Sequence, residues 1–341
     1  MKPLRIAVLM HAELVPPQSL EGYTPEEIHR WKVEYDVVAT LQNLGHKVEI
    51  VPVEDDFRPV RLALKEFRPH VAFNLLAHFH GAAAYESALV SWLELHKQPY
   101  TGCNPRGIFV ANDKALCKKV LQYHRIRAPR FLTVPRGKAP SLRKGGLEFP
   151  LFVKSASEHA SAGIAQASIV RDEEQLRERV DFIHRSVGTA ALCEEYIEGR
   201  ELTIGVLGNK RLELAPVWEV FFGELPSTAP RIMTSRLKWD LAYQKQVGLE
   251  TGPAELDDET RTKIARLGRR IYRVLGLSGY ARIDLRLDAQ GRIWVLEANP
   301  NPDLCFGEDF AESFERVGYS YPQLLQKLVN LGRRYEAPWM G

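Results

Sequence analysis

The chain has 341 residues, of which 45% are hydrophobic and 26% charged, as in an ordinary soluble globular protein with two or three domains. The 46 basic and 43 acidic side chains leave a net charge of only +3, and no basic run predicts binding to nucleic acid. No apolar run is long enough to cross a bilayer and no signal peptide is indicated, so we expect a cytoplasmic protein without membrane contact.

Residues 1–110 alternate short apolar runs with amphipathic stretches. Strands are predicted over residues 4–10, 47–53 and 71–76, and helices over residues 25–44, 60–67 and 83–95. This alternation is typical of a parallel sheet with helices on its faces, so the segment is predicted to form an α/β domain. Such sheets bind ligands beyond the carboxyl ends of their strands, where Glu13 and His80 are candidate substrate-binding residues.

Residues 111–200 predict a smaller second unit that contains two notable lysines. Lys114 lies in the first turn of a helix predicted over residues 112–124 and capped by Asn112. A lysine there opposes the helix dipole unless an anion is near, which favours a phosphate contact. Lys154 ends a strand predicted over residues 149–155, and the small residues of the following loop, 155–163, suit a lid over phosphates. Further elements are predicted over residues 130–134 (strand), 172–185 (helix) and 190–197 (strand).

The last part of the chain predicts a strand over residues 202–207 and amphipathic helices over residues 257–275 and 321–335. Between them, residues 223–253 mix prolines, glycines and charges, and are expected to form ordered loops.

Residues 280–303 predict two strands joined by a polar turn. Arg282 and Asp284 share one face of the first strand, and Glu297 and Asn299 share one face of the second. Pairing of the strands would bring the four side chains into one patch, whose carboxylate and amide oxygens suit Mg²⁺. The alternative is an amphipathic hairpin with a solvated charged face. The rigid Asn-Pro-Asn-Pro turn that follows Glu297 favours a binding site.

The order of these motifs resembles the ATP-grasp superfamily, and within it the D-alanine–D-alanine ligases. The resemblance covers about residues 3–335 and is carried by Asn112-Asp-Lys114, Phe152-Val-Lys154 and residues 194–203 and 282–302. It implies an N-terminal α/β domain of parallel sheet and helices (residues 1–110), a small central domain (111–200) and a C-terminal ATP-grasp domain (201–341). ATP would lie between the last two.

The resemblance also implies a role for individual residues. Around ATP it places Lys114 and Lys154 at the phosphates and Lys238 at the γ-phosphate. At the other end of the nucleotide it places Glu194 at the adenine amino group and the backbone from Glu195 to Ile197 at the adenine edge. Glu201 would contact the ribose. Asp284, Glu297 and Asn299 match its Mg²⁺ ligands, with two ions implied and Mn²⁺ as a substitute, and Arg282 matches its catalytic arginine.

The expected reaction is ATP-dependent carboxylate–amine ligation on small amino-acid-like molecules. A carboxylate attacks the γ-phosphate, and an amine then displaces phosphate from the acyl phosphate, leaving ADP and phosphate. Both steps need charge neutralised on oxygen atoms and neither needs an enzyme nucleophile. The alternatives are ATP-grasp chemistry with another nucleophile, as in a carboxylase or kinase, and a non-catalytic nucleotide-binding regulator. The family resemblance also suggests a homodimer.

The amino-acid half of the family pattern is altered in this chain. Residues 300–305, Pro-Asn-Pro-Asp-Leu-Cys, replace the family's Ser/Thr-rich turn that holds the acceptor, and residues 84–87 and 11–17 also depart from the pattern. In the lid, residues 157–161 lack the usual Gly-Ser-Ser. Asn301 and Asp303 in the altered turn join Glu13 and His80 as candidate substrate-binding residues, and the identity of the substrate stays open.

Overall fold

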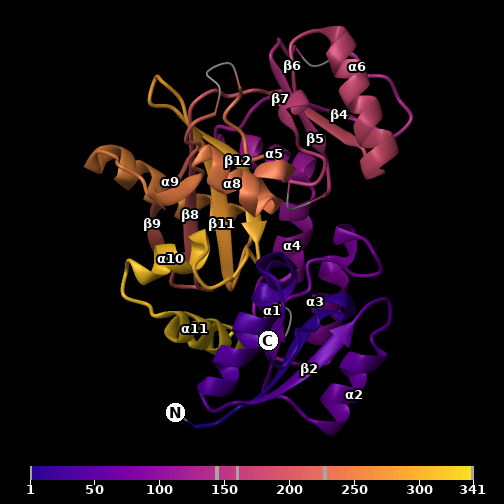
Figure 1. The fold of residues 1–341 in the computed structure, drawn as a ribbon, viewed down its shortest axis with the longest axis vertical. Coiled ribbons are helices and arrows are strands. Elements are labelled where there is room, and N and C mark those ends of the chain that lie inside the picture. The colour runs from indigo at the N-terminus through magenta and orange to yellow at the C-terminus, as the bar shows by residue number, and fades with distance from the viewer. Residues whose placement is uncertain (1, 143–145, 159–160, 226–228, 339–341) are drawn as a thin grey trace.

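The computed structural model describes residues 2–142, 146–158, 161–225 and 229–338, which form three sheets (Figure 1). The N-terminal sheet has the order β2-β1-β3 and is parallel throughout. Its strands are β1 (Arg5–His11), β2 (Lys47–Val53) and β3 (Val71–Asn74), and the helices around it are α1 (Pro25–Asn43), α2 (Arg58–Glu66) and α3 (Glu86–Leu95). The predicted α/β fold is confirmed, and β2 has the predicted bounds.

The central sheet is antiparallel, with the order β4-β7-β5-β6. Its strands are β4 (Phe131–Val134), β5 (Leu151–Ser155), β6 (Ile169–Val170) and β7 (Ala191–Glu195). Helix α6 (Glu173–Phe182) packs Leu176 and Val180 against Val153 and Cys193 of this sheet. Short helical turns within the described residues include Ala12–Leu14, Ala83–Tyr85, Gln166–Ser168 and the π-helix Ile183–Val187.

The C-terminal sheet is also antiparallel, with the order β10-β9-β8-β11-β12. Its strands are β8 (Arg200–Leu207), β9 (Glu213–Phe221), β10 (Glu250–Pro253), β11 (Tyr280–Leu287) and β12 (Ile293–Pro300). The remaining helices are α4 (Pro105–Asn112), α5 (Lys114–Tyr123), α7 (Ser235–Trp239), α8 (Leu241–Val247), α9 (Asp258–Val274), α10 (Asp309–Glu315) and α11 (Tyr321–Arg333). None of the helices in the described part of the chain has the length and apolar character needed to cross a membrane.

The expectation of loops over residues 223–253 is wrong, because α7, α8 and β10 lie there. The two helices span only five and seven residues, too few for an apolar period to show in the sequence. Each is started by a side-chain cap: Thr234 accepts from the backbone N of Leu237, and Asp240 from that of Tyr243. Strand β10 exists through its pairing with β9, which was itself not predicted and which contains Pro216.

The helix predicted over residues 112–124 begins two residues later, and its cap is Asp113 rather than Asn112. Asp113 accepts from the backbone N of Leu116, whereas Asn112 ends the preceding helix α4, which was not predicted. The side chain of Asn112 instead donates to Glu86 Oε2 at 2.7 Å. The side chain of Asn112, which the local sequence pattern predicted as the helix cap, is therefore used in a tertiary hydrogen bond instead.

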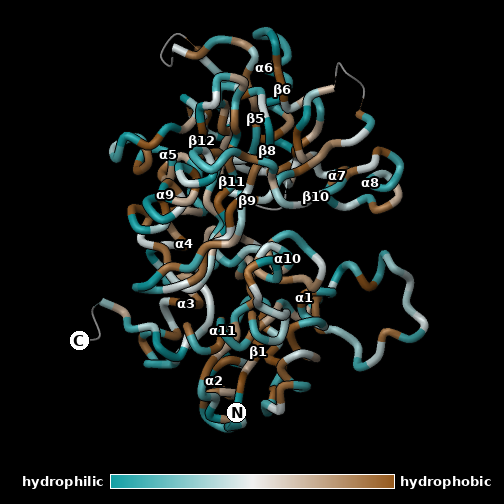
Figure 2. Tube along the Cα trace, turned by 90° about the vertical axis from the view of Figure 1, so that its left-hand side faces the viewer, coloured by the Kyte–Doolittle hydropathy of each residue, from teal (hydrophilic) through white to brown (hydrophobic). Residues whose placement is uncertain are grey.

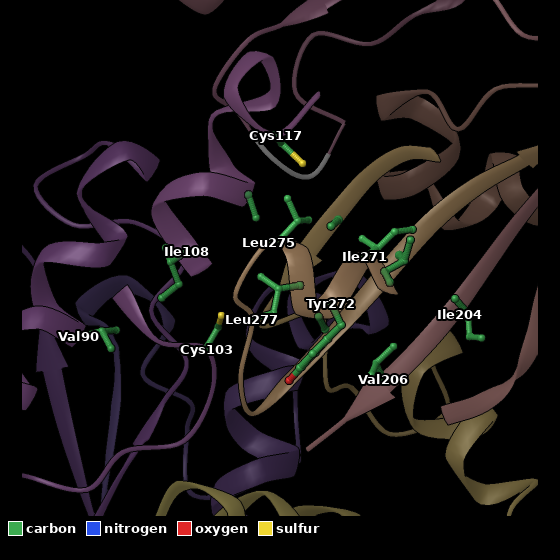
Figure 3. Close-up of a cluster of buried hydrophobic side chains, with 14 of the residues drawn as sticks. Val90, Cys103, Ile108, Cys117, Ile204, Val206, Ile271, Tyr272, Leu275 and Leu277 are labelled. Carbon is green, nitrogen blue, oxygen red and sulfur yellow. The ribbon is translucent and has the colours of Figure 1, made fainter. Parts of the chain in front are cut away.

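A single hydrophobic cluster connects the N-terminal and C-terminal sheets. In Figure 3, Ile108 of α4 and the neighbouring Cys103 lie beside Tyr272 and Leu275 of α9. The Tyr272 hydroxyl donates to the carbonyl of Gly208 at 2.7 Å, so this buried aromatic keeps a polar partner. On the other side, a second hydrophobic cluster contains residues of α10, α11 and β1. In it α10 lies against β8 and β9, and α11 lies against β3 and α1, so both helices lie between the two sheets (Figures 1 and 2). The end of the chain thus returns to the first sheet.

Gly332 shows how closely α11 approaches the rest of the fold. A Cβ at this position would overlap the carbonyl oxygen of Tyr100, which is backbone and cannot rotate away. We expect Gly332→Ala to lower the free energy of unfolding by about 1–3 kcal/mol, measured by urea denaturation. Gly252→Ala is the matched control, since its added methyl group would meet nothing closer than 3.7 Å. An unchanged midpoint for Gly332→Ala would contradict this close packing.

Candidate active site

The hairpin of β11 and β12 assembles the four predicted side chains into one patch. Arg282 lies opposite Asn299, and Asp284 lies opposite Glu297, in the antiparallel register. Arg282 donates twice to Asp284, from Nε at 2.7 Å and from a terminal nitrogen at 3.0 Å, and Asn299 Nδ2 donates to the same carboxylate at 2.8 Å. These four residues are called here the hairpin patch; three of them, Arg282, Asp284 and Asn299, are joined by hydrogen bonds, and Glu297 is brought beside them by the strand register.

Two lysines from two other elements face this patch, and a third lies behind them. Lys154 at the end of β5 lies with Nζ 3.6 Å from Glu297 Oε2, and Lys114 of α5 lies 3.8 Å from the same oxygen. Lys154 also forms an ion pair of 3.0 Å with Glu194 of β7, which Lys118 of α5 contacts at 2.9 Å. The residues that the sequence analysis placed around ATP phosphates and metal therefore converge between the central and C-terminal sheets.

Glu194 is a buried carboxylate kept ionised by its two lysines. Its side chain is 3% exposed, and burial alone would raise its pKa. Lys118 and Lys154 outweigh that effect, so the pKa of Glu194 lies below its usual value. The pKa of Lys114 is lowered, chiefly by burial, which leaves its ammonium poorly solvated and receptive to a further anion.

Lys118 was not singled out from the sequence, although it has the most protected position of the three lysines. Its Nζ also donates to the carbonyl of Leu296 at 3.1 Å. That carbonyl is available because the pairing of β11 and β12 shifts register next to Asp284, and a bulge redirects backbone groups. The available signal was its spacing from Lys114, since residues four apart share a helix face.

Glu201 and Arg286 form a second buried pair further along the C-terminal sheet. They lie opposite each other on β8 and β11, with a contact of 2.7 Å. Arg286 also donates to the carbonyls of Gly199 and Arg231, each at 3.0 Å. Burial raises the pKa of Glu201 although Arg286 opposes the shift. The sequence did not predict a role for Arg286, because charged residues at every second position of a strand usually lie on a solvated face.

The segment that follows Glu194 leads from the central sheet toward the C-terminal sheet. The side chain of Glu195 is directed to Arg130, whose Nε donates to Oε1 at 2.7 Å and whose backbone N donates to Oε2 at 2.9 Å. The backbone N of Glu195 in turn donates to the carbonyl of Arg130 at 3.0 Å. Ile197 follows two residues later, just before β8 begins at Arg200.

Lys238 belongs to α7, and its ammonium lies 5.5 Å from the centre of the Trp239 ring. Burial and Arg282 lower its pKa, while Asp303, Asp284 and Glu297 act to raise it, so its ammonium lies among these charges. The helix that carries it is attached to the predicted lid: the Ser235 hydroxyl donates to the carbonyl of Ser161, and the backbone N of Ser235 donates at 2.9 Å to the carbonyl of Ile164, the residue after the lid. Residues 159 and 160 of that lid lie outside the described part of the chain.

The candidate substrate residues of the N-terminal sheet gather near its strand ends. The rings of His11 and His78 lie 4.6 Å apart, and burial together with His11 lowers the pKa of His78. Glu13 and Glu158 of the lid act in the opposite direction on the same ring, so these groups share one region. His80 is exposed, and its backbone N donates to the carbonyl of Glu54 at 3.1 Å.

The two candidates in the altered turn have different surroundings. Asn301 has a φ of 51°, and its side chain accepts from the backbone N of Cys103 at 2.8 Å and donates to Glu86 at 3.0 Å. It therefore ties the end of β12 to the N-terminal part of the chain. Asp303 is exposed and accepts from the backbone N of Cys305 at 2.8 Å.

Known relatives match almost the whole chain. The uncharacterized protein y4sG of Sinorhizobium fredii is 30% identical over 343 residues, covering 97% of this chain and 97% of that protein. The D-alanine–D-alanine ligase of Desulforudis audaxviator is 29% identical, covering 87% of this chain and 91% of its own length. The crystal structure of D-alanine–D-alanine ligase from Bacillus anthracis has the same fold, with a TM-score of 0.76 and 21% identity over 97% of this chain and 98% of that one. The same ligase complexed with ATP gives a TM-score of 0.74 at 20% identity, with the same coverage.

The fold, and the convergence of lysines and carboxylates between two antiparallel sheets, define an enzyme of the ATP-grasp class, an ATP-dependent ligase. Residues 120–330 match the family model described as D-ala D-ala ligase C-terminus. The chain belongs to the D-alanine–D-alanine ligase family.

Proposed function

We propose that this enzyme joins a carboxylate to an amine at the expense of ATP, through an acyl phosphate. The observation that carries the proposal is the approach of Lys114 and Lys154 to Glu297 of the hairpin patch. Cations that face a carboxylate-rich patch can hold the phosphates of ATP on one side and a metal ion on the other. Family membership favours C–N ligation over carboxylation, a kinase reaction or a non-catalytic regulator.

The donor set of the hairpin patch fits Mg²⁺. Asp284 and Glu297 offer carboxylate oxygens and Asn299 an amide oxygen, and phosphate oxygens and water would complete an octahedron. We propose these three residues as ligands for two ions, with Mn²⁺ as a substitute. The metal would neutralise charge on the phosphate oxygens. Arg282, held by Asp284, would hold the transferred phosphoryl group or the tetrahedral oxyanion.

The remaining roles follow the same arrangement. Lys238 would contact the γ-phosphate, because its ammonium lies among the charges of the hairpin patch. Glu201 would contact the ribose, and the backbone from Glu195 to Ile197 the adenine edge. A contact of Glu194 with the adenine amino group stays a prediction, since that carboxylate is already shared by two lysines. Glu13 and His80 are proposed to border the amino-acid substrates, and Asn301 to set the position of the turn.

The family resemblance also supports two proposals about organisation. We propose the division into domains 1–110, 111–200 and 201–341, with ATP between the last two, and a homodimer in solution. Analytical ultracentrifugation measures the oligomeric state directly.

The ligase proposal is tested with purified protein, ATP, Mg²⁺ and a panel of amino acids. We expect release of ADP and phosphate that depends on the added substrate, and a product whose mass is that of the two substrates minus water. A carboxylated or phosphorylated product would instead identify one of the other ATP-grasp reactions. Absence of ADP release with every substrate pair would contradict ligase activity.

Lys118 provides a test of how Glu194 is held. We expect Lys118→Met to lower the free energy of unfolding by about 3–5 kcal/mol, because it leaves a buried carboxylate with only one cation. The KM for ATP should rise as well, because Lys118 helps to fix Glu194, and Glu194 in turn positions Lys154. Lys119→Met, on the exposed side of the same helix, is the control. Thermal unfolding and steady-state kinetics measure both effects, and wild-type values for Lys118→Met would refute this role.

A further inference from the structure

Arg286 is a buried arginine on the face of the C-terminal sheet that carries the hairpin patch. Strand β11 lies between β8 and β12 (Figure 1), and it pairs with β8 without a change of register from Tyr280 to Leu287. Residues at every second position of such a strand share a face, so Arg286 lies on the same face as Arg282 and Asp284. The residue is only 4% exposed. Its guanidinium is therefore directed to the side of the sheet on which ATP is proposed to bind.

Three oxygen atoms of the chain accept hydrogen bonds from this guanidinium. Nη2 donates to Glu201 Oε2 at 2.7 Å, and Nη1 donates at 3.0 Å to each of the carbonyls of Gly199 and Arg231. Gly199 comes just after the segment that is proposed at the adenine edge, and Arg231 lies in the loop that leads to α7. Arg286 thus connects parts of the chain that the proposed function places around the nucleotide.

The third nitrogen of the guanidinium, Nε, is left without a partner. It is buried, and none of the described residues accepts a hydrogen bond from it. A buried donor without an acceptor costs about 1–3 kcal/mol, and more when the group is charged. Most buried polar groups in proteins are satisfied, so the unpaired N–H indicates an acceptor that the chain itself does not supply.

Glu201 offers the complementary group. It stands opposite Arg286 in the pairing of β8 with β11, and its side chain is largely buried. Among the described residues, the hydrogen bond to its carboxylate is the one that Arg286 donates to Oε2, which leaves Oε1 able to accept from a ligand. Burial raises the pKa of Glu201, but the charge of Arg286 opposes that shift and favours the ionised form. An ionised carboxylate accepts stronger hydrogen bonds than a neutral acid does.

A donor and an acceptor of opposite charge therefore lie side by side, and a ligand must match both. A hydroxyl group can donate one hydrogen bond and accept others, so two adjacent hydroxyl groups match a guanidinium N–H and a carboxylate oxygen together. A phosphate group would be repelled by Glu201, and an ammonium group by Arg286. The pair consequently fits a vicinal diol, which ATP carries on its ribose.

We propose that Arg286 is a nucleotide-binding residue that selects a ribonucleoside triphosphate. Its Nε–H donates to one hydroxyl group of the ribose, while the other hydroxyl group donates to Glu201, which Arg286 also holds in position. The inference rests on the proposed function, which places ATP at this sheet, and adds to it a residue that recognises the sugar. The phosphates stay with Lys114, Lys154 and the hairpin patch, so the two ends of ATP are recognised separately.

The test compares nucleotides that differ in one hydroxyl group of the sugar. ATP, 2′-deoxy-ATP and 3′-deoxy-ATP are titrated with Mg²⁺ into the full chain by calorimetry, without amino acids. We expect the wild type to bind ATP on the order of 10- to 100-fold more tightly than either deoxy nucleotide, as for hydrogen bonds to charged groups. Arg286→Met should reduce this preference to about 3-fold or less, because it removes the donor and frees Glu201. Arg292→Met, which removes an arginine paired with Asp288 on the same hairpin, should retain the preference.

Two further measurements distinguish recognition of the sugar from a structural role of Arg286. Inorganic tripolyphosphate has no nucleoside, so it should bind to Arg286→Met as tightly as to the wild type. The double variant Glu201→Gln with Arg286→Met leaves neither member of the pair as an unpaired buried charge, so it should fold and also lack the preference. Loss of tripolyphosphate binding in step with ATP, or a preference for ATP kept by either variant, would overturn the inference.

The titrations need no turnover, so they separate this inference from the ligase proposal. A preference for ATP that disappears in Arg286→Met supports the inference even if no substrate pair releases ADP, a result that would refute ligation alone. Equal affinity of the wild type for ATP and both deoxy nucleotides would contradict the inference and leave the ligase proposal standing.

Discussion

Replacing Arg282 by alanine should abolish amide formation while leaving ATP binding largely intact. The guanidinium is held in place by the two hydrogen bonds that it donates to Asp284, so it needs no reorganisation to meet an oxyanion. Loss of one such preorganised donor costs about 10²–10³ in kcat in other enzymes. ADP release with the best substrate pair measures kcat, and calorimetric titration with a non-hydrolysable ATP analogue measures binding.

Arg292→Ala is the control for this variant, because Arg292 lies on the same hairpin but is bound to Asp288 in its turn. We expect Arg292→Ala to keep kcat within a few-fold of wild type. If Arg282→Ala lost ATP binding to the same degree as activity, the arginine would serve the nucleotide and its proposed role at the transition state would be wrong.

Replacing Glu297 by glutamine should raise the Mg²⁺ concentration that gives half-maximal activity by at least about 10- to 100-fold. The amide keeps the shape of the side chain but removes one of the two carboxylate charges in the proposed donor set. It also removes the anion that Lys114 and Lys154 approach at 3.8 and 3.6 Å. These lysines should then bind the ATP phosphates at least as tightly as they do in the wild type. Titration of ADP release with Mg²⁺ and with Mn²⁺ measures the shift.

Glu213→Gln is the matched control, since Glu213 is paired with Lys327 outside the hairpin patch. Its Mg²⁺ dependence should equal that of the wild type. If the Glu297→Gln variant showed unchanged Mg²⁺ dependence, Glu297 would not be a metal ligand, and another carboxylate would have to bind the ion.

The substrate half of the enzyme is where the sequence predicts departures from the family pattern. In the turn after β12, the Asn301 side chain forms hydrogen bonds with Cys103 and Glu86. It therefore connects the C-terminal sheet to the N-terminal part of the chain. Asp303 is exposed, and its carboxylate accepts from the backbone N of Cys305 at 2.8 Å. The altered turn would therefore bear on the choice of substrate, while the hairpin patch keeps the residues proposed for phosphoryl transfer.

Much of the fold could be predicted from local pattern. Strand β2 was predicted with its observed bounds, and the alternation on β11 and β12 placed Arg282, Asp284, Glu297 and Asn299 on one patch. These predictions depend on period-2 patterns and on turn residues, which act over a few neighbouring positions. Elements that depend on distant partners were missed, among them β10, which is formed by pairing with β9.

The sequence by itself determined the class of the enzyme and the composition of its hairpin patch, because both are encoded in residues that lie close together in the chain. Only the tertiary structure decided which charges meet. Lys118 meets Glu194, Arg286 meets Glu201 and Asn112 meets Glu86 across separations of 76, 85 and 26 residues. Burial makes these pairings strong, and burial is a property of the packed sheets rather than of any segment.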